Sequence, residues 1–253
     1  MTTLSFAPAA GAAPAYRRVV RHALVEARLL VRNGEQLLLA LVIPLAILVA
    51  GRVLGGRFGS LTTLAPSVLG LAVWSSAFTS VAIATGFERR YGVLERLAAT
   101  PLGRSGLLAG KALAVVLVLL GQLVVLSAAA ALLGWRPAYT AASLALAVLV
   151  VVLSTAAFVC LALLLAGRLR AEAILGLANL IYVVLLVGGG LVLPLSRYPA
   201  AVRTVLEVLP TAALGEGLRA AAVGQLLTWP LLTVLTWLVL AGAAAWKGFR
   251  WTA

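Results

Sequence analysis

The sequence contains no aspartate, one histidine and one cysteine, and its seven acidic residues are all glutamates. A metal-dependent enzyme within a membrane needs clustered carboxylates, and these counts leave little material for such a site. A serine–histidine protease would need an imidazole inside a membrane span, whereas His22 lies in a basic N-terminal arm. The single thiol, Cys160, sits in an apolar run and permits no internal disulfide. These absences argue against an intramembrane enzyme.

Long hydrophobic runs dominate what is present. The chain is 63% hydrophobic, and its mean hydropathy of +1.12 is far above that of an ordinary soluble domain. A helix of about 20 apolar residues crosses the hydrocarbon layer of a bilayer. Six runs approach or exceed that length, at residues 37–55, 64–85, 107–133, 141–166, 173–193 and 226–246. The sequence predicts an all-α polytopic membrane protein with six transmembrane helices.

The N-terminal region divides into a tail and an arm. Residues 1–15 are rich in alanine, proline and threonine, which predicts a disordered tail. Residues 16–253 are expected to form a single transmembrane domain. The arm, Tyr16–Gln36, has four arginines, at positions 17, 21, 28 and 32, within about 60° of one another on a helical wheel. With apolar residues opposite them, this pattern predicts an interfacial amphipathic helix, and a cytosolic helix is the alternative.

The charge is strongly basic, with 20 lysines and arginines and a net charge of +13. In a soluble protein this balance would suggest nucleic acid, but here the basic residues flank apolar spans. Anionic membrane lipid is therefore the expected partner, and nucleic acid is not. Six basic residues fall on one side of the predicted spans, namely Arg52, Arg57, Arg136, Arg197, Arg203 and Arg219, and the other fourteen fall on the opposite side. By the positive-inside rule, both termini are expected in the cytoplasm.

A charged island, residues 86–111, separates the second and third predicted spans. Its apolar residues recur at helical spacing, at Phe87, Tyr91, Leu94 and Ala98. Two pairs of like residues stand seven positions apart, Glu88 with Glu95 and Arg89 with Arg96. The Thr100-Pro101 step ends the pattern, because proline disfavours the helical conformation of the residue before it. The island therefore predicts a helix of about three turns across the membrane face, with a docking partner.

The island resembles the first cytoplasmic loop of ABC-2 type transporter permeases, the membrane subunits of ATP-driven exporters. The matching residues are Glu88, Arg89, Tyr91, Gly92, Glu95, Arg96, Leu97, Thr100, Pro101, Gly110 and Lys111. In that family the loop forms a coupling helix that seats in a groove of the ATPase subunit. The resemblance implies that this role belongs here to residues 88–101, including Arg90 and Leu94. The alternative is a generic basic loop beside the membrane.

The stretch between the fifth and sixth predicted spans, residues 194–225, is too long for a turn and too apolar for a disordered loop. It predicts two short helices, Val202–Leu209 and Ala213–Val223, broken at Pro210. ABC-2 permeases similarly carry short external or re-entrant helices before their last span. The local resemblance rests on Leu193-Pro194, Pro210-Thr211 and Arg219, and Ala213 departs from the polar or aromatic residue more common in the family.

The chain is not expected to hydrolyse ATP. The stretch Ser105–Ala112 looks like a phosphate-binding loop, but it lacks the leading glycine and the closing serine or threonine. The resemblance therefore implies no cofactor in this chain, with ATP and magnesium held by two copies of a separate ATPase subunit. It also implies a second permease, identical or a sister chain, in a bacterial plasma membrane.

The cargo implied by the resemblance is a hydrophobic or amphipathic compound, such as a drug, an antibiotic or a lipid, moved outward by alternating access. A polysaccharide or glycolipid is the alternative cargo within the family. An ion-coupled secondary transporter is the rival from another class. Such proteins place ionisable residues in mid-membrane, whereas none of the seven glutamates falls centrally in a predicted span.

Overall fold

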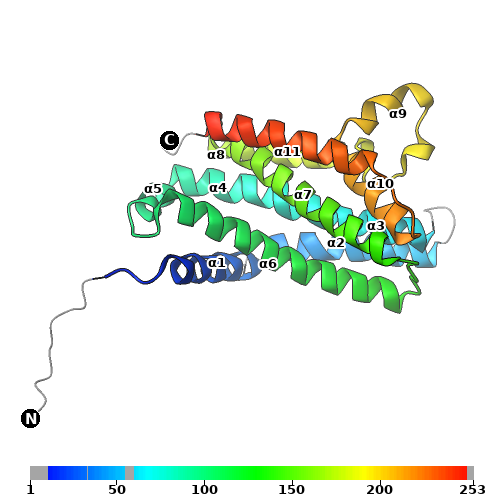
Figure 1. Cartoon of the computed structure of the whole chain (residues 1–253), viewed down its shortest axis with the longest axis horizontal. Coiled ribbons are helices and arrows are strands. Elements are labelled where there is room, and N and C mark those ends of the chain that lie inside the picture. Colours follow the sequence, from blue (N-terminus) through cyan, green and yellow to red (C-terminus); the bar gives the residue numbers. More distant parts are fainter. Residues whose placement is uncertain (1–10, 33, 55–59, 250–253) are drawn as a thin grey trace, which may run out of the picture.

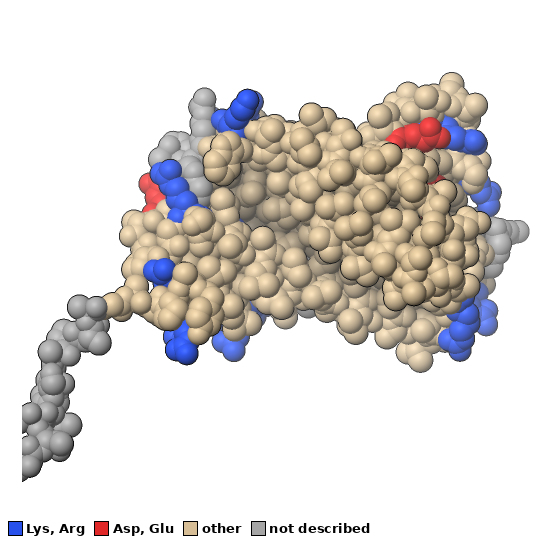
Figure 2. Space-filling view, viewed as in Figure 1, with Lys and Arg blue, Asp and Glu red and all other residues tan. Residues whose placement is uncertain are grey.

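The computed structural model describes residues 11–32, 34–54 and 60–249, with the backbone alone over residues 34–39. Every regular element in these ranges is a helix, and most helices run along one long axis (Figure 1). Charged side chains gather at the two ends of the molecule, and the band between them is apolar on the face shown (Figure 2). This distribution fits a bundle that spans a membrane, and the predicted all-α class is confirmed.

Five helices in the described ranges are long and apolar enough to cross a bilayer. They are Leu61–Arg90, which comprises α3 (Leu61–Trp74), η2 (Ser75–Ser80) and α4 (Val81–Arg90), then α6 (Gly103–Leu132), α7 (Ala141–Ala166), α8 (Ala171–Gly188) and α11 (Trp229–Gly248). They coincide with the second to sixth predicted spans. The first predicted span, residues 37–55, falls largely in α2 (Gly34–Val53), of which Ala40–Val53 is described with its side chains as an apolar helix, and residue 55 lies outside the described residues.

The centre of the bundle is the long helix α3–η2–α4. All its residues from Leu64 to Trp74 are buried, whereas the neighbouring helices expose much of their apolar surface. Trp74 stacks on Phe78 with ring centroids 4.3 Å apart, and Phe158 of α7 meets Trp74 edge-on at 4.8 Å. Ser75–Ser80 forms a π-helical turn in mid-helix, a local widening that often marks functional sites.

The N-terminal arm forms α1 (Ala15–Arg32), shorter than the predicted Tyr16–Gln36 because α2 begins at Gly34. Helix α1 packs along the first half of α6, with Ala23 fully buried between them. The predicted amphipathic pattern is confirmed in part. Ala23 belongs to the packed face, but Val20 and Val31 of the predicted apolar side are exposed. The location of α1 at a membrane surface stays a prediction. Residues 1–10 of the predicted tail lie outside the described ranges.

Two short helices precede α11, as predicted, after a single turn at Leu195–Arg197. They are α9 (Ala200–Glu207) and α10 (Pro210–Ala222). Pro210 does not break a helix but begins α10, where its missing N–H costs nothing. Helix α10 is buried along nearly its whole length against α3, α7 and α11. It therefore enters the bundle, in agreement with a re-entrant helix.

Candidate functional site

The island forms a corner rather than one helix across the membrane face. Its first residues, up to Arg90, continue the long helix as α4, and Val93–Ala98 form a separate short helix, α5. Gly92 makes the corner with φ +67°, a left-handed conformation that glycine adopts without strain. The predicted three-turn helix is therefore wrong in form, because the helical pattern continues through a position where the backbone turns.

The corner separates residues that the predicted helix placed on common faces. Glu88 and Arg89 turn inward, where Arg89 is 8% exposed and donates a hydrogen bond to the carbonyl oxygen of Leu169. Glu95 and Arg96, seven positions later, are exposed on α5. Sequence spacing of seven keeps two residues on one face only within a continuous helix. The four charges thus form two sets in different environments.

The predicted apolar stripe is also divided. Leu94 is 1% exposed and fixes α5 against α4 and α6. Tyr91 is 61% exposed, and its ring lies 6.2 Å from that of half-buried Phe87. Leu97 is half-buried, whereas Thr100 and Pro101 are exposed. The outward surface of the corner, called here the corner surface, consists of Arg90, Tyr91, Glu95, Arg96, Thr100 and Pro101.

The inward side holds a cluster of charges that sequence reasoning missed. Lys111 of α6 donates a 2.6 Å hydrogen bond to Glu88 of α4 and a 3.3 Å hydrogen bond to Glu26 of α1. His22 lies one turn before Glu26, with Nε2 3.6 Å from its carboxylate. All three side chains around Lys111 are mostly buried. One ammonium therefore joins three helices. In the sequence, the signal for this cluster is a lysine at the start of an apolar run, because such a lysine needs a counter-charge nearby.

Small residues of α6 allow α1 to come this close. A Cβ built on Gly110 would overlap the His22 ring, lying 3.2 Å from its Cγ and nearer still to Cδ2. A Cβ on Gly106 would meet the side chains of Leu102 and Val19. Burial lowers the pKa of His22 below its ordinary value, and Lys111 acts in the same direction against the attraction of Glu26. His22 is therefore held neutral at physiological pH.

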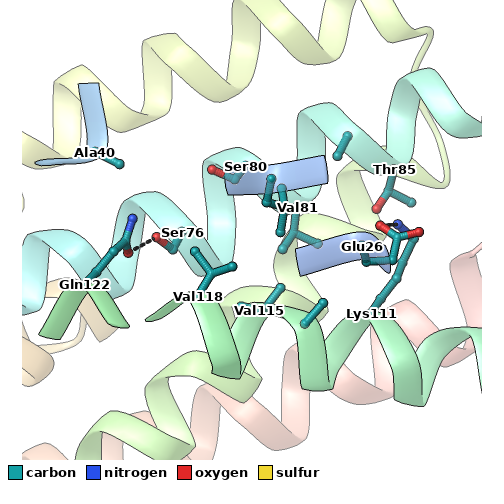
Figure 3. Close-up of a pocket in the computed structure, with 13 residues that line it drawn as sticks. Glu26, Ala40, Ser76, Ser80, Val81, Thr85, Lys111, Val115, Val118 and Gln122 are labelled. Carbon is teal, nitrogen blue, oxygen red and sulfur yellow. Dashed lines mark hydrogen bonds and ion pairs between the residues drawn. The ribbon is translucent and has the colours of Figure 1, made fainter. Parts of the chain in front are cut away.

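A narrow cavity of about 50 Å³ opens beside this cluster between α1, α4 and α6 (Figure 3). Lys111 and Glu26 lie at one end, and at the other Ser76 donates a 2.6 Å hydrogen bond to Gln122. Valine and alanine side chains line the space between these two contacts. The cavity has room for a few water molecules but not for a drug-sized compound. In this conformation it is a narrow seam with an apolar lining and a polar contact at each end.

Water in this seam would reach buried oxygens that lack a partner among the described residues, including Thr85 Oγ1 and Glu88 Oε2. Metal binding finds no support, because the described part of the chain contains no group of three or more His, Cys, Asp or Glu side chains placed to hold an ion. The seam can therefore couple the positions of α1, α4 and α6, and the corner surface can carry a partner.

The fold and these sites define a polytopic helical membrane protein with a structured corner between two spans. The chain matches the family model "ABC-2 type transporter" over residues 23–223, which include α2 to α10, the corner and the Lys111 cluster. The protein belongs to the ABC-2 type transporter family. No curated protein sequence matches the chain. Membership makes this chain a membrane component of a transporter, as the island indicated, and implies in general a partner ABC ATPase.

Proposed function

We propose that this chain is the permease subunit of an ABC exporter and that its ATPase subunit docks on the corner surface. The observation that carries the proposal is the division of the corner into two sides. Its inward side chains are engaged by the bundle, whereas Tyr91, Glu95 and Arg96 are exposed, and exposed Arg90 forms an ion pair with Glu172 of α8. An exposed aromatic residue with arginines is the composition favoured at protein interfaces. ATP and magnesium would be bound by the partner, not by this chain.

The same division supports a mechanism for coupling. Helix α5 is joined directly to two spanning helices, through Gly92 to α4 and through Pro101 to α6. A displacement of α5 by a closing ATPase dimer would therefore move both helices as levers. Lys111 extends the connection to α1, because it bonds Glu88 and Glu26 at once. The predicted movement is alternating access, with α1, α4 and α6 shifting together at the end that bears the corner.

The proposed topology has six spans with both termini in the cytoplasm. Helix α1 and the C-terminal end of α11 lie at the same end of the bundle as α5 (Figure 1). A chain that starts and finishes on one side must cross the membrane an even number of times. The five long apolar helices satisfy this condition if α2 is a sixth crossing. The excess of basic residues on the side of the corner supports its cytoplasmic placement.

The proposed cargo is hydrophobic or amphipathic and moves outward across a bacterial plasma membrane, along a path between two permease chains, identical or sister. Apolar grooves on the bundle, including one of about 540 Å³ beside α1, favour such compounds over a polysaccharide. On the face shown in Figure 2, charged side chains gather at the two ends and are rare in the apolar band between them. A polar polymer would find few hydrogen-bonding partners along that band.

Co-purification tests the docking step. The permease is expressed with its ATPase, and the ATPase recovered per folded permease is measured for Glu95→Ala and Arg96→Ala. Glu207→Ala is the matched control, because Glu207 is an exposed glutamate on α9 at the opposite end. Truncating one partner of a desolvated charge pair costs about 2–5 kcal/mol, against below about 1 kcal/mol for an exposed charge. We expect at least tenfold lower ATPase recovery for either corner variant. Recovery with Glu207→Ala should equal that of the wild type. Full recovery for the single and double corner variants would refute the proposal.

A further inference from the structure

We infer that the bundle carries a specific site for one anionic phospholipid, in a groove between α8 and the pair α7–α11. The site lies away from the corner surface and the Lys111 cluster and does not depend on the proposed coupling role. It consists of an apolar channel that ends at two basic side chains, Arg168 and Lys247. The arrangement of helices, the length of the groove and the position of its charges each point to this ligand.

The groove exists because α8 and α11 pack against different helices. Helix α11 packs along α7, whereas α8 packs chiefly on α4 and η2. The space between them has a volume of about 460 Å³, within the range that holds an organic ligand. Trp74 and Phe78 form its floor, and its walls are apolar, with Leu161, Leu164, Leu165, Leu169, Ile181 and Leu185. A fatty acyl chain fits the chemistry of these walls.

The basic end of the groove opens into a second hollow of about 330 Å³, lined by Arg168, Lys247, Gly248 and Phe249. Arg168 lines both spaces, so that they adjoin at its side chain. Its guanidinium lies against Gly248, the residue that follows Lys247. Both basic side chains are exposed, and within the described residues neither forms an ion pair. Two adjacent cations facing a hollow at a helix end suit a phosphate group.

The length of the groove matches one leaflet of a bilayer. On α11, Trp237 lines the groove and Lys247 lines the adjoining hollow, and they are ten residues apart, which corresponds to about 15 Å along a helix. Half of the hydrocarbon thickness is also about 15 Å. Trp246 beside Lys247 is 89% exposed, as expected of an indole at the membrane surface. A lipid with its phosphate between the two cations would place one acyl chain in the groove.

Native mass spectrometry of the whole detergent-solubilised chain tests the site, with phosphatidylglycerol and phosphatidylcholine as probes. Each basic residue beside an anionic headgroup is worth about a fivefold change in affinity, hence about 25-fold for two. We expect one retained phosphatidylglycerol, and loss of most of its preference over phosphatidylcholine in Arg168→Gln/Lys247→Gln. The control Arg136→Gln/Arg197→Gln removes two exposed charges near the opposite end and should bind as the wild type does. Equal binding of both lipids by the wild type, or no change in the groove double variant, would overturn the inference.

A second pair of variants tests the acyl channel. Leu165→Trp fills the groove and should abolish retention of both lipids, whereas Val148→Trp adds the same ring to the exposed surface of α7 and should not. Size-exclusion profiles and thermal unfolding identify any variant that fails to fold, and Leu161→Trp then replaces Leu165→Trp. Unchanged retention in a folded groove-filling variant would reduce the site to headgroup attraction and refute the channel. Displacement by inorganic phosphate at the lipid concentration would show a simple anion site, and cross-linking of two chains through the groove would show a protein interface; either result contradicts the inference.

Discussion

Arg219 of α10 donates a 2.7 Å hydrogen bond to Ser67 of α3, which lies 152 positions earlier in the sequence. The same guanidinium donates to the carbonyl oxygens of Leu191 and Gly190, each at 2.8 Å, and to Glu216 at 3.0 Å. Its side chain is 8% exposed. One arginine therefore ties α10 to the central helix α3–η2–α4 and to the loop after α8, and it does so at the end of the molecule opposite the corner (Figure 1).

Replacing Arg219 by methionine is expected to destabilise the protein by about 3–5 kcal/mol, because it leaves Glu216 and two carbonyl groups without their cation. For a chain of this size the midpoint of thermal unfolding should fall by about 10 °C. Arg197→Met, at an exposed position two residues after Leu195, is the control and should change the midpoint little. Equal midpoints for the two variants would mean that Arg219 is not the anchor of α10.

The contact between Gly110 and His22 predicts that α1 can pack this closely only where α6 has a glycine. Gly110→Ala should push the His22 ring away and loosen α1, because a Cβ there overlaps the ring. Gly121→Ala is the matched control, since a Cβ at that position of the same helix meets nothing within 4 Å. Limited proteolysis at the arginines of α1 should proceed several-fold faster in Gly110→Ala and at the wild-type rate in Gly121→Ala. Equal rates would contradict the docking geometry.

The lowered pKa of His22 predicts that α1 docks less firmly in acid. Burial, the largest cause, disfavours the protonated imidazole in the docked state, so that the undocked state binds the proton more tightly. The contribution of His22 to stability is then complete above the ordinary pKa of about 6.5 and is lost as pH falls through the lowered value. Glu26 and Lys111 act on this histidine, Glu88 is bound to Lys111, and all three remain in place when His22 is replaced.

The measurement is the thermal unfolding midpoint between pH 8 and pH 5 for the wild type and His22→Gln. The wild type should lose stability relative to the variant below about pH 6.5, because only the wild type gains a proton on leaving the docked state. Above pH 7 the two curves should run parallel. A wild type that gains stability in acid relative to His22→Gln would reverse the sign and show that Glu26 outweighs burial.

Much of the fold was predictable because hydrophobic runs of membrane length have few other structures available. Five predicted spans and both short helices before α11 appear within a few residues of their expected positions. Where the ends differ, local backbone chemistry explains the shift. Helix α8 ends at Gly188 rather than 193, since Gly190 takes φ +69°. Helix α11 begins at Trp229, next to a proline suited to a first turn.

The site was less predictable, because it depends on tertiary contacts that periodicity does not encode. The pattern from Phe87 to Ala98 is helical throughout, and only the left-handed Gly92 divides it. The partners of Lys111 come from α1, about 85 residues away, and from α4, 23 residues away. A wheel of α1 alone separates charge from apolar surface, but it does not reveal that Glu26 faces another helix. Long-range pairing therefore had to come from the structure.

The proposed topology predicts that Ser105 and Ser196 lie on opposite sides of the membrane. Both are exposed, so single cysteines there, in a Cys160→Ala background, should react fully with a soluble reagent. The cysteine at 196 should label in intact cells, and the one at 105 only after permeabilisation. Labelling of both positions from one side would mean that the chain crosses the membrane an even number of times between them. That result would refute the six-span arrangement.

The corner predicts different consequences for two apolar residues that a continuous helix would treat alike. Leu94 is 1% exposed between α4 and α6, and Leu94→Ala should cost about 2–5 kcal/mol of stability. Tyr91 is 61% exposed, and Tyr91→Ala should cost below about 1.5 kcal/mol, since it loses only its ring contacts with Phe87 and with the guanidinium of Arg90. Thermal unfolding of the purified permease without its partner should therefore separate the two variants.

Recovery of the ATPase should rank the same two variants in the opposite order. Folded Leu94→Ala keeps the exposed residues of the corner, whereas Tyr91→Ala removes the aromatic residue of the proposed docking surface. We expect near-normal ATPase recovery per folded molecule for Leu94→Ala and a loss of tenfold or more for Tyr91→Ala. Equal destabilisation by both variants would favour a continuous helix in which Tyr91 packs against the bundle. Normal recovery with Tyr91→Ala would instead exclude this ring from the interface and leave docking to Glu95 and Arg96.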